Sequence, residues 1–355
     1  MSSKDETCWF LAVDFDKAGW EEDIAAFRTT CHDFDVIPAI ERSRSGKGGH
    51  AWFFFQFPVP ASTARKMGCA LLTYTMERRH QLGLDSYDRL FPSQDTMPKG
   101  GFGNLIALPL QAGPRRQRST LFLDNNLEPY PDQWAFLSRL EKIPFQKVES
   151  IVAEAQQAGK VLGIRLSLED EDEVSEKTPW LKAIRHHEDL PLDSIPSQVK
   201  ITLSGLLYIE KEGLPTALLN RLIRLAAFQN PDFYRAQAMR LSTFARPRII
   251  GCGQDFLQHI ALPRGCLEEV LEFFKFLRVK VLTDDQRFSG TPVTCRFHGT
   301  LLPQQKQALK ALLEQDTGIL SAPTAFGKTV VAAAAIAARG VNTLVLVHRN
   351  LRVQL

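Results

Sequence analysis

The stretch Cys8-Trp-Phe-Leu-Ala-Val-Asp-Phe-Asp16 (CWFLAVDFD) is an apolar run that ends in two acids. Such a run predicts a buried strand whose carboxyl end emerges at a site. Because side chains alternate along a strand, we expect Asp14 and Asp16 on one face with their carboxylates close together. Two adjacent carboxylates repel unless a cation lies between them, and hard divalent ions take oxygen ligands. The pair indicates either a metal site or two surface acids at a strand end.

The next two expected strands, VIPAIERS (36–43) and HAWFFFQF (50–57), are separated by a glycine-rich turn. This turn carries Lys47, and His50 follows it at the mouth of a very apolar strand. Backbone N–H groups and a lysine supply the positive charge that nucleotide phosphates require. Taken alone, His50 is more typical of a structural histidine.

Together, LAVDFD (11–16) and SGKGGH (45–50) resemble the archaeo-eukaryotic primase superfamily. Its first motif is a D-x-D after a hydrophobic residue, its second is a small residue two positions before a histidine, and its third is a lone acid. The resemblance implies that Asp14, Asp16 and His50 are catalytic. It also implies that Lys47, Gly48 and His50 bind a nucleotide, with Gly48 in the place of the usual serine.

The third acid has two candidates in this sequence. We expect Asp95, because its distance to the stretch GNLIALPL (103–110) is closer to the spacing of the family, and Asp88 is the alternative. With Asp14 and Asp16, the third acid would complete a metal site.

A narrower resemblance covers most of residues 8–140. YDRLFPSQDTMPKGGFGNLIALPLQ (87–111) and FLDNNLEPYPDQW (122–134) look like the primase domain of TOTE conflict systems, in which a primase is fused to a helicase of the XPB/Ssl2 type. The resemblance implies an α+β primase-like domain with an RRM-like catalytic core, Mg²⁺ or Mn²⁺, and nucleoside triphosphate substrates. It implies DNA as a partner, together with nucleases or other operon-encoded proteins of such systems.

Basic side chains form two further groups of candidates. A turn beyond GNLIALPL contains arginines that could contact a template or triphosphate, or could simply be exposed to solvent: Arg115, Arg116 and Arg118. The middle of the chain contains arginines near Phe244 that could face DNA, because arginine pairs with phosphates and aromatic rings stack on bases: Arg240, Arg246, Arg248 and Arg264. Structural arginines in a small helical module are the alternative.

Near the C-terminus, APTAFGKT (322–329) matches a phosphate-binding loop, with Ala322 in place of the first glycine. In this motif backbone amides cradle phosphate, the lysine reaches the β and γ oxygens, and the threonine holds Mg²⁺. We expect ATP to contact Thr324, Gly327, Lys328 and Thr329. Strands are expected at GIL (318–320) and NTLVLV (342–347), flanking an alanine-rich helix.

The segment FHGTLLPQQKQALKALL (297–313) resembles a helicase glutamine motif, which implies that Gln305 contacts adenine. A D-E-x-H box and a second RecA-like lobe do not follow. We therefore expect the N-terminal part of a longer primase–helicase that binds ATP but hydrolyses it slowly or not at all.

The whole chain of 355 residues suggests two or three domains and has a formal charge of +3. We expect a primase-like domain (1–165), an acidic linker (166–195), a small mixed α/β module (196–295) and the start of an α/β RecA-like domain (296–355). Six cysteines without a C-x-x-C pair, and no leader or membrane span, predict a soluble cytoplasmic protein. The rival to a primase–helicase is an inert nucleic-acid-binding module that delivers the helicase to DNA.

Overall fold

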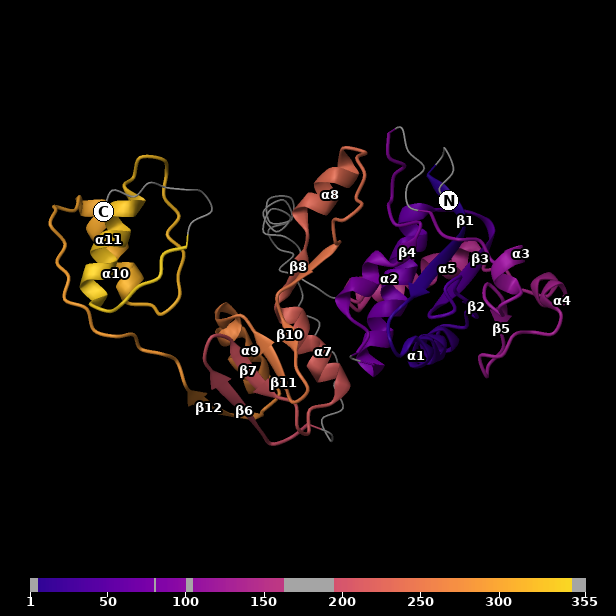
Figure 1. Cartoon of the computed structure of the whole chain (residues 1–355), viewed down its shortest axis with the longest axis horizontal. Helices are drawn as coiled ribbons and strands as arrows, with labels where there is room; N and C mark the ends of the chain where they lie inside the picture. The colour runs from indigo at the N-terminus through magenta and orange to yellow at the C-terminus, as the bar shows by residue number, and fades with distance from the viewer. Residues whose placement is uncertain (1–5, 80, 100–104, 163–194, 347–355) are drawn as a thin grey trace.

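A computed structural model describes residues 6–79, 81–99, 105–162 and 195–346 (Figure 1). The expected acidic linker lies outside these residues, apart from Ile195. We call residues 6–162 the first module. Its elements are β1 (Thr7–Phe15), α1 (Trp20–Asp33), β2 (Ala39–Arg42), β3 (Gly49–Pro60), α2 (Ala61–Arg78), η1 (Leu84–Asp88), β4 (Leu90–Phe91), α3 (Ala112–Arg115), β5 (Phe122–Leu123), α4 (Gln133–Ser138) and α5 (Phe145–Gln157).

Among the described residues, the first module contains an antiparallel sheet of five strands in the order β4-β1-β3-β2-β5. The strands expected at the start of the chain are confirmed as β1, β2 and β3. Alternation along β1 sends Leu11, Val13 and Phe15 into the main core, where all three are buried. Ala12 belongs to a separate cluster on the other face of the sheet.

Three helices supply the apolar side chains that cover the main-core face of this sheet, namely α1, α2 and α5. The helix expected from Trp20 is confirmed as α1, which begins with three acids in its first turn, where the helix dipole favours negative charge. The opposite face carries a smaller cluster around Trp52 and Phe122. Partly buried residues from the segment 105–140 pack on that cluster, so both faces are covered over most of the sheet.

One expected strand of this module is absent. Residues 105–110 of GNLIALPL lie in irregular structure, and Leu105 and Leu108 are 63% and 65% exposed. An apolar run forms a buried strand only when it pairs and both of its faces are covered. Here Ile106 and Leu110 alone pack on the cluster beneath, so the prediction of a strand over the described part of this stretch is wrong.

We call residues 195–285 the second module. Its elements are β6 (Gln198–Leu203), β7 (Leu207–Glu210), α7 (Thr216–Leu225), β8 (Ala227–Gln229), α8 (Pro231–Ala238), β9 (Ile249–Gly251), β10 (Gln254–Asp255), β11 (His259–Leu262), η3 (Arg264–Cys266), α9 (Leu267–Phe276) and β12 (Lys280–Asp285). Within the described residues its main sheet has the order β10-β11-β7-β6-β12, and β12 runs parallel to β6. Helices α7 and α9 provide the rest of its core.

The two modules contact each other through α7, β8, α8 and β9. Ala227 and Ile249 belong to the main core of the first module, although they lie in the second module. The side chain of Asn230 caps α8 by accepting a hydrogen bond from the N–H of Asp232, which fixes where this helix begins. The loop after β4 contacts this helix and the turn that follows it, because Thr96 donates to the carbonyl oxygen of Gln237 and the N–H of Lys99 donates to the carbonyl oxygen of Arg240.

The C-terminal segment contains α10 (Pro303–Leu313) and α11 (Lys328–Arg339). The helix expected after the phosphate-binding loop is confirmed as α11. The flanking strands are not formed over 318–320 or 342–346, and Ile319, Leu344 and Leu346 are each more than 80% exposed. Parallel strands are stable only when buried on both faces, and no described strand pairs with these stretches. The prediction of strands there is wrong for the described residues.

Candidate functional site

A row of polar side chains crosses the first sheet at one end. Asp14 of β1 lies directly opposite His50 of β3, which lies opposite Glu41 of β2. On the other side, the N–H of Asp14 donates to the carbonyl oxygen of Arg89, just before β4, at 2.9 Å. Directly opposed residues share one face of a sheet and have their Cβ atoms within about 5.5 Å. The strand register alone thus brings together side chains from four separate segments of the chain.

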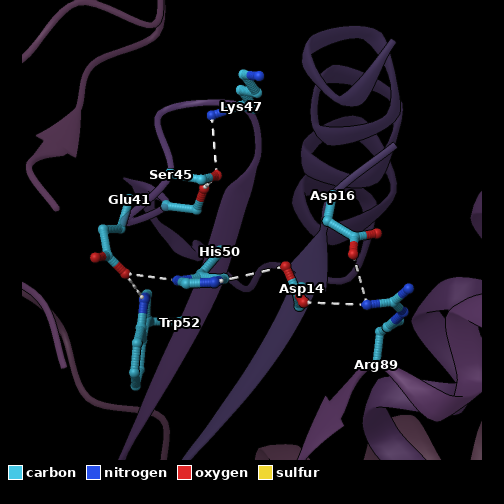
Figure 2. A network of polar contacts seen from close by, with 9 residues as sticks. Asp14, Asp16, Glu41, Ser45, Lys47, His50, Trp52 and Arg89 are labelled. Carbon is cyan, nitrogen blue, oxygen red and sulfur yellow. Dashed lines mark hydrogen bonds and ion pairs between the residues drawn. The ribbon is translucent and has the colours of Figure 1, made fainter. Parts of the chain in front are cut away.

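The inner end of this row is a buried hydrogen-bonded group (Figure 2). Oε2 of Glu41 lies 2.9 Å from Nδ1 of His50 and accepts the indole N–H of Trp52 at 2.8 Å. Nε2 of His50 points the other way and lies 3.5 Å from Oδ1 of Asp14. The side chains of Glu41, His50 and Trp52 come from the paired strands β2 and β3, which hold them on a rigid surface.

At the outer end, the predicted acidic pair lies together. Nη1 of Arg89 is 2.6 Å from Oδ2 of Asp16 and 3.7 Å from Oδ2 of Asp14. Burial raises the pKa of the Asp14 carboxyl above its usual range, a rise that His50 and Arg89 oppose and that Asp16 strengthens. The two carboxylates thus form an anionic site that already attracts a cationic group.

The turn between β2 and β3 explains the glycine in the second motif. A Cβ on Gly48 would lie 2.5 Å from the carbonyl oxygen of Phe15, so no larger residue fits without a shift of backbone. Lys47 is exposed on this turn, and its N–H donates to Oγ of Ser45 at 3.2 Å. Figure 2 shows the lysine side chain extending from the turn away from His50.

The predicted cluster of three acids is not assembled. Among the described residues, no group of three or more His, Cys, Asp or Glu side chains is placed to hold a metal ion. The carboxylate of Asp95 instead forms an ion pair with the buried Arg65 and accepts a hydrogen bond from the Gln237 side chain at 2.8 Å. The alternative, Asp88, accepts the N–H of Arg248 at 2.7 Å. Both acids join the two modules.

The candidate arginines fall into two kinds. Most are exposed, as nucleic-acid contacts require: Arg115, Arg116, Arg118, Arg240, Arg246 and Arg264. Arg118 forms an ion pair with Glu128, and Arg264 lies in the second module. Arg248 is only 2% exposed, and its guanidinium stacks on Phe233 with 4.3 Å between the guanidinium carbon and the ring centre. Of the two alternatives for Arg248, its burial between the modules favours the structural arginine over a DNA contact.

Two of the residues predicted to bind ATP, Gln305 and Lys328, contact the backbone of the loop 322–329. Nε2 of Gln305 donates to the carbonyl oxygen of Phe326 at 2.8 Å, beside Gly327, whose positive φ of 84° suits glycine. Nζ of Lys328 donates to the carbonyl oxygen of Ala322 at 2.6 Å. Thr324, Lys328 and Thr329 are exposed. The side chain of Lys328 is thus held by a carbonyl oxygen at the start of the same loop.

Sequence reasoning missed three members of the polar row. Glu41, Trp52 and Arg89 are identified only when the strands are paired, although Glu41 is a single acid directly after the apolar run 36–40. That isolated acid is the one signal that the sequence contained.

The part of the chain that the structure describes contains no helix long and apolar enough to cross a membrane. A comparison with curated proteins gave no match. Residues 1–151 match the family model described as TOTE conflict system, Archaeo-Eukaryotic Primase domain. The matched residues include the strands of the first sheet, the acidic pair and His50. The match indicates that this first part of the chain is a primase-type nucleotidyltransferase domain acting on nucleic acid.

Proposed function

We propose that the first module catalyses metal-dependent, template-directed nucleotidyl transfer on DNA. The observation that carries this proposal is the row in which Asp14 and His50 stand opposite each other at the end of a rigid sheet, with Asp16 beside them. The family match over residues 1–151 supports the same reaction class.

The chemistry of the acidic pair fits a divalent ion such as Mg²⁺ or Mn²⁺. Asp14 and Asp16 offer carboxylate oxygens, which are the ligands that these hard cations prefer. Arg89 already lies against both carboxylates, which supports the inference that the pair requires a counter-charge. When bound, the ions would neutralise charge on the attacking and leaving oxygens of a phosphoryl transfer.

The remaining groups would hold the nucleoside triphosphate. His50 presents Nε2 next to Asp14, and the exposed Lys47 could reach phosphate from the flexible turn above. Gly48 keeps the turn close to the end of β1, since a side chain there would collide with the strand. A third carboxylate, Asp95 or alternatively Asp88, would have to leave its present partners to join the pair.

For the C-terminal segment we propose ATP binding by the loop 322–329, as in the ATPase of a DNA helicase or translocase. Support comes from the contact of Gln305 with the loop and from the exposed Lys328 and Thr329 at the start of α11. An N-terminal end of a helix favours phosphate, because its N–H groups and dipole point at the anion.

The proposal for the first module is tested by incubating the chain with a primed and an unprimed DNA template, Mn²⁺ or Mg²⁺, and labelled nucleotides. The control is Asp14→Ala/Asp16→Ala. Product that depends on the template and disappears in the double variant supports the proposal. Binding of DNA without product by the wild-type chain contradicts it and favours an inert module that delivers a helicase to DNA.

A further inference from the structure

Glu41 is a fully buried acid in the sheet of the first module, with 0% of its surface exposed. Burying a carboxylate is costly unless it is paired and hydrogen-bonded. Within the described residues, no lysine or arginine forms an ion pair with it, and its oxygen Oε1 has no hydrogen-bond partner. An apolar side chain would suit this position better if stability alone mattered.

What Glu41 does contact is the ring of His50. Its Oε2 also accepts the indole N–H of Trp52, a group that can only donate. An ionised carboxylate can only accept, so with Glu41 in this form Nδ1 of His50 is the atom that donates to the shared oxygen. The hydrogen bond made by one ring nitrogen determines the role of the other, so Nε2 is left facing Asp14.

The contact between His50 and Asp14 is too long to hold the ring. Its 3.5 Å exceeds the usual range for an N–H···O hydrogen bond, whereas the 2.9 Å contact with Glu41 lies within it. Trp52 is itself fixed, since it is 2% exposed and its ring lies 5.2 Å from that of Phe10 and 6.3 Å from that of Phe54. The ring of His50 is thus oriented from behind, by Glu41.

We propose that Glu41 is a positioning residue, which accepts a hydrogen bond from Nδ1 of His50 and so fixes the ring in the orientation from which a protonated Nε2 donates to a phosphate group of the incoming nucleoside triphosphate. This inference rests on the nucleotide-binding role proposed above for His50. Glu41 would act only through the histidine, because it is covered by the sheet and touches no substrate.

The test compares two variants of the full chain. Glu41→Leu removes the acceptor and the buried charge, whereas Glu41→Gln keeps an acceptor oxygen in the same place. The control is Thr73→Val, which removes a buried hydrogen bond with Tyr87 in the core of the same module, away from the polar row. Each protein is measured for the ¹⁵N chemical shifts of its histidine rings, for deoxynucleoside triphosphate binding with Ca²⁺, and for nucleotide incorporation. His50→Asn identifies the His50 signals.

In the wild-type chain we expect His50 to prefer a proton on Nδ1 both free and with nucleotide bound, where Nε2 is protonated as well and donates to the phosphate. Glu41→Leu should lose this preference and bind the nucleotide about 10-fold to 100-fold more weakly, the usual cost of losing a group that orients a site residue. Glu41→Gln should restore most of the preference and the affinity. Thr73→Val should change neither, even if its stability falls.

The proposal is overturned if Glu41→Leu keeps the wild-type ring signals and nucleotide affinity, or if Glu41→Gln is as defective as Glu41→Leu. If Glu41→Leu does not fold, Glu41→Asp replaces it, because this variant keeps the charge but withdraws the acceptor from Nδ1 of His50. Glu41→Asp should then shift the His50 signals and weaken nucleotide binding, and wild-type signals and affinity in Glu41→Asp would overturn the proposal. Absence of incorporation by the wild-type chain would refute the polymerase proposal alone, because the ring signals and nucleotide binding do not depend on turnover.

Discussion

Replacing Arg248 by methionine should weaken the contact between the two modules. Arg248 is 2% exposed, donates from Nη2 to the carbonyl oxygen of Ser93 at 2.7 Å, and stacks on Phe233. A hydrogen bond from a charged group contributes about 1.5–3 kcal/mol, and a desolvated cation–π contact contributes about 2 kcal/mol. Methionine keeps much of the volume but neither interaction.

Part of this loss is offset, because the variant also removes a buried charge that lies close to Arg65. We therefore expect a net loss of about 2–4 kcal/mol in the free energy of unfolding, in the upper range for single substitutions. Urea denaturation measures this loss, and hydrogen exchange shows whether residues 88–96 lose protection. The matched control is Arg246→Met, two residues away and exposed, which should change stability by less than about 0.5 kcal/mol. Equal stability of the two variants would refute the proposed role of Arg248 in joining the modules.

Three further predictions concern charge. Mn²⁺ at about 100 times its dissociation constant should stabilise the wild-type chain by about 2.7 kcal/mol and should not stabilise Asp14→Asn. Thermal unfolding of Asp95→Asn with and without Mn²⁺ tests the third acid, because retained stabilisation places Asp95 outside the metal site. Burial raises the pKa of Asp88 above the unfolded value of 3.8, so the contribution of Asp88 to stability falls as pH rises through the folded pKa. In urea denaturation, Asp88→Asn should therefore match the wild-type chain at low pH and be more stable than the wild-type chain at neutral pH. A lower stability of Asp88→Asn at neutral pH would contradict this. Lys328→Ala should weaken binding of a fluorescent ATP analogue at least 10-fold, since Lys328 is the side-chain cation of the loop, and unchanged binding would remove the loop from ATP recognition.

The sequence predicted the elements whose apolar pattern is buried. β1, α1 and β3 formed where expected, because their side chains pack into one core and the pattern directly reports that burial. The stretch 105–110 has a similar apolar content but lies at the margin of the smaller cluster. Composition does not distinguish a covered strand from a half-exposed loop.

The site was predictable only in part, for a reason of geometry. Asp14, Asp16 and His50 could be grouped because they lie at the ends of neighbouring strands and match a known motif. Glu41 and Arg89 join them through strand order and register, which place β2 and β4 on opposite sides of the β3–β1 pair. The roles of Asp95 and Asp88 depend on Gln237 and Arg248, more than 140 residues further along the chain. Contacts of this range leave no local pattern.

The burial of Ala227 and Ile249 in the main core of the first module has a practical consequence for making this protein in pieces. The family match ends at residue 151, and a gene fragment cut there would encode the whole first sheet with α1 and α2 but would cut α5 (Phe145–Gln157) within its length. That fragment would lack both apolar residues and would expose Arg65 and Asp88 to water. A truncated product would therefore aggregate or unfold more readily than the longer chain, and inactivity of such a fragment would say little about the catalyst itself.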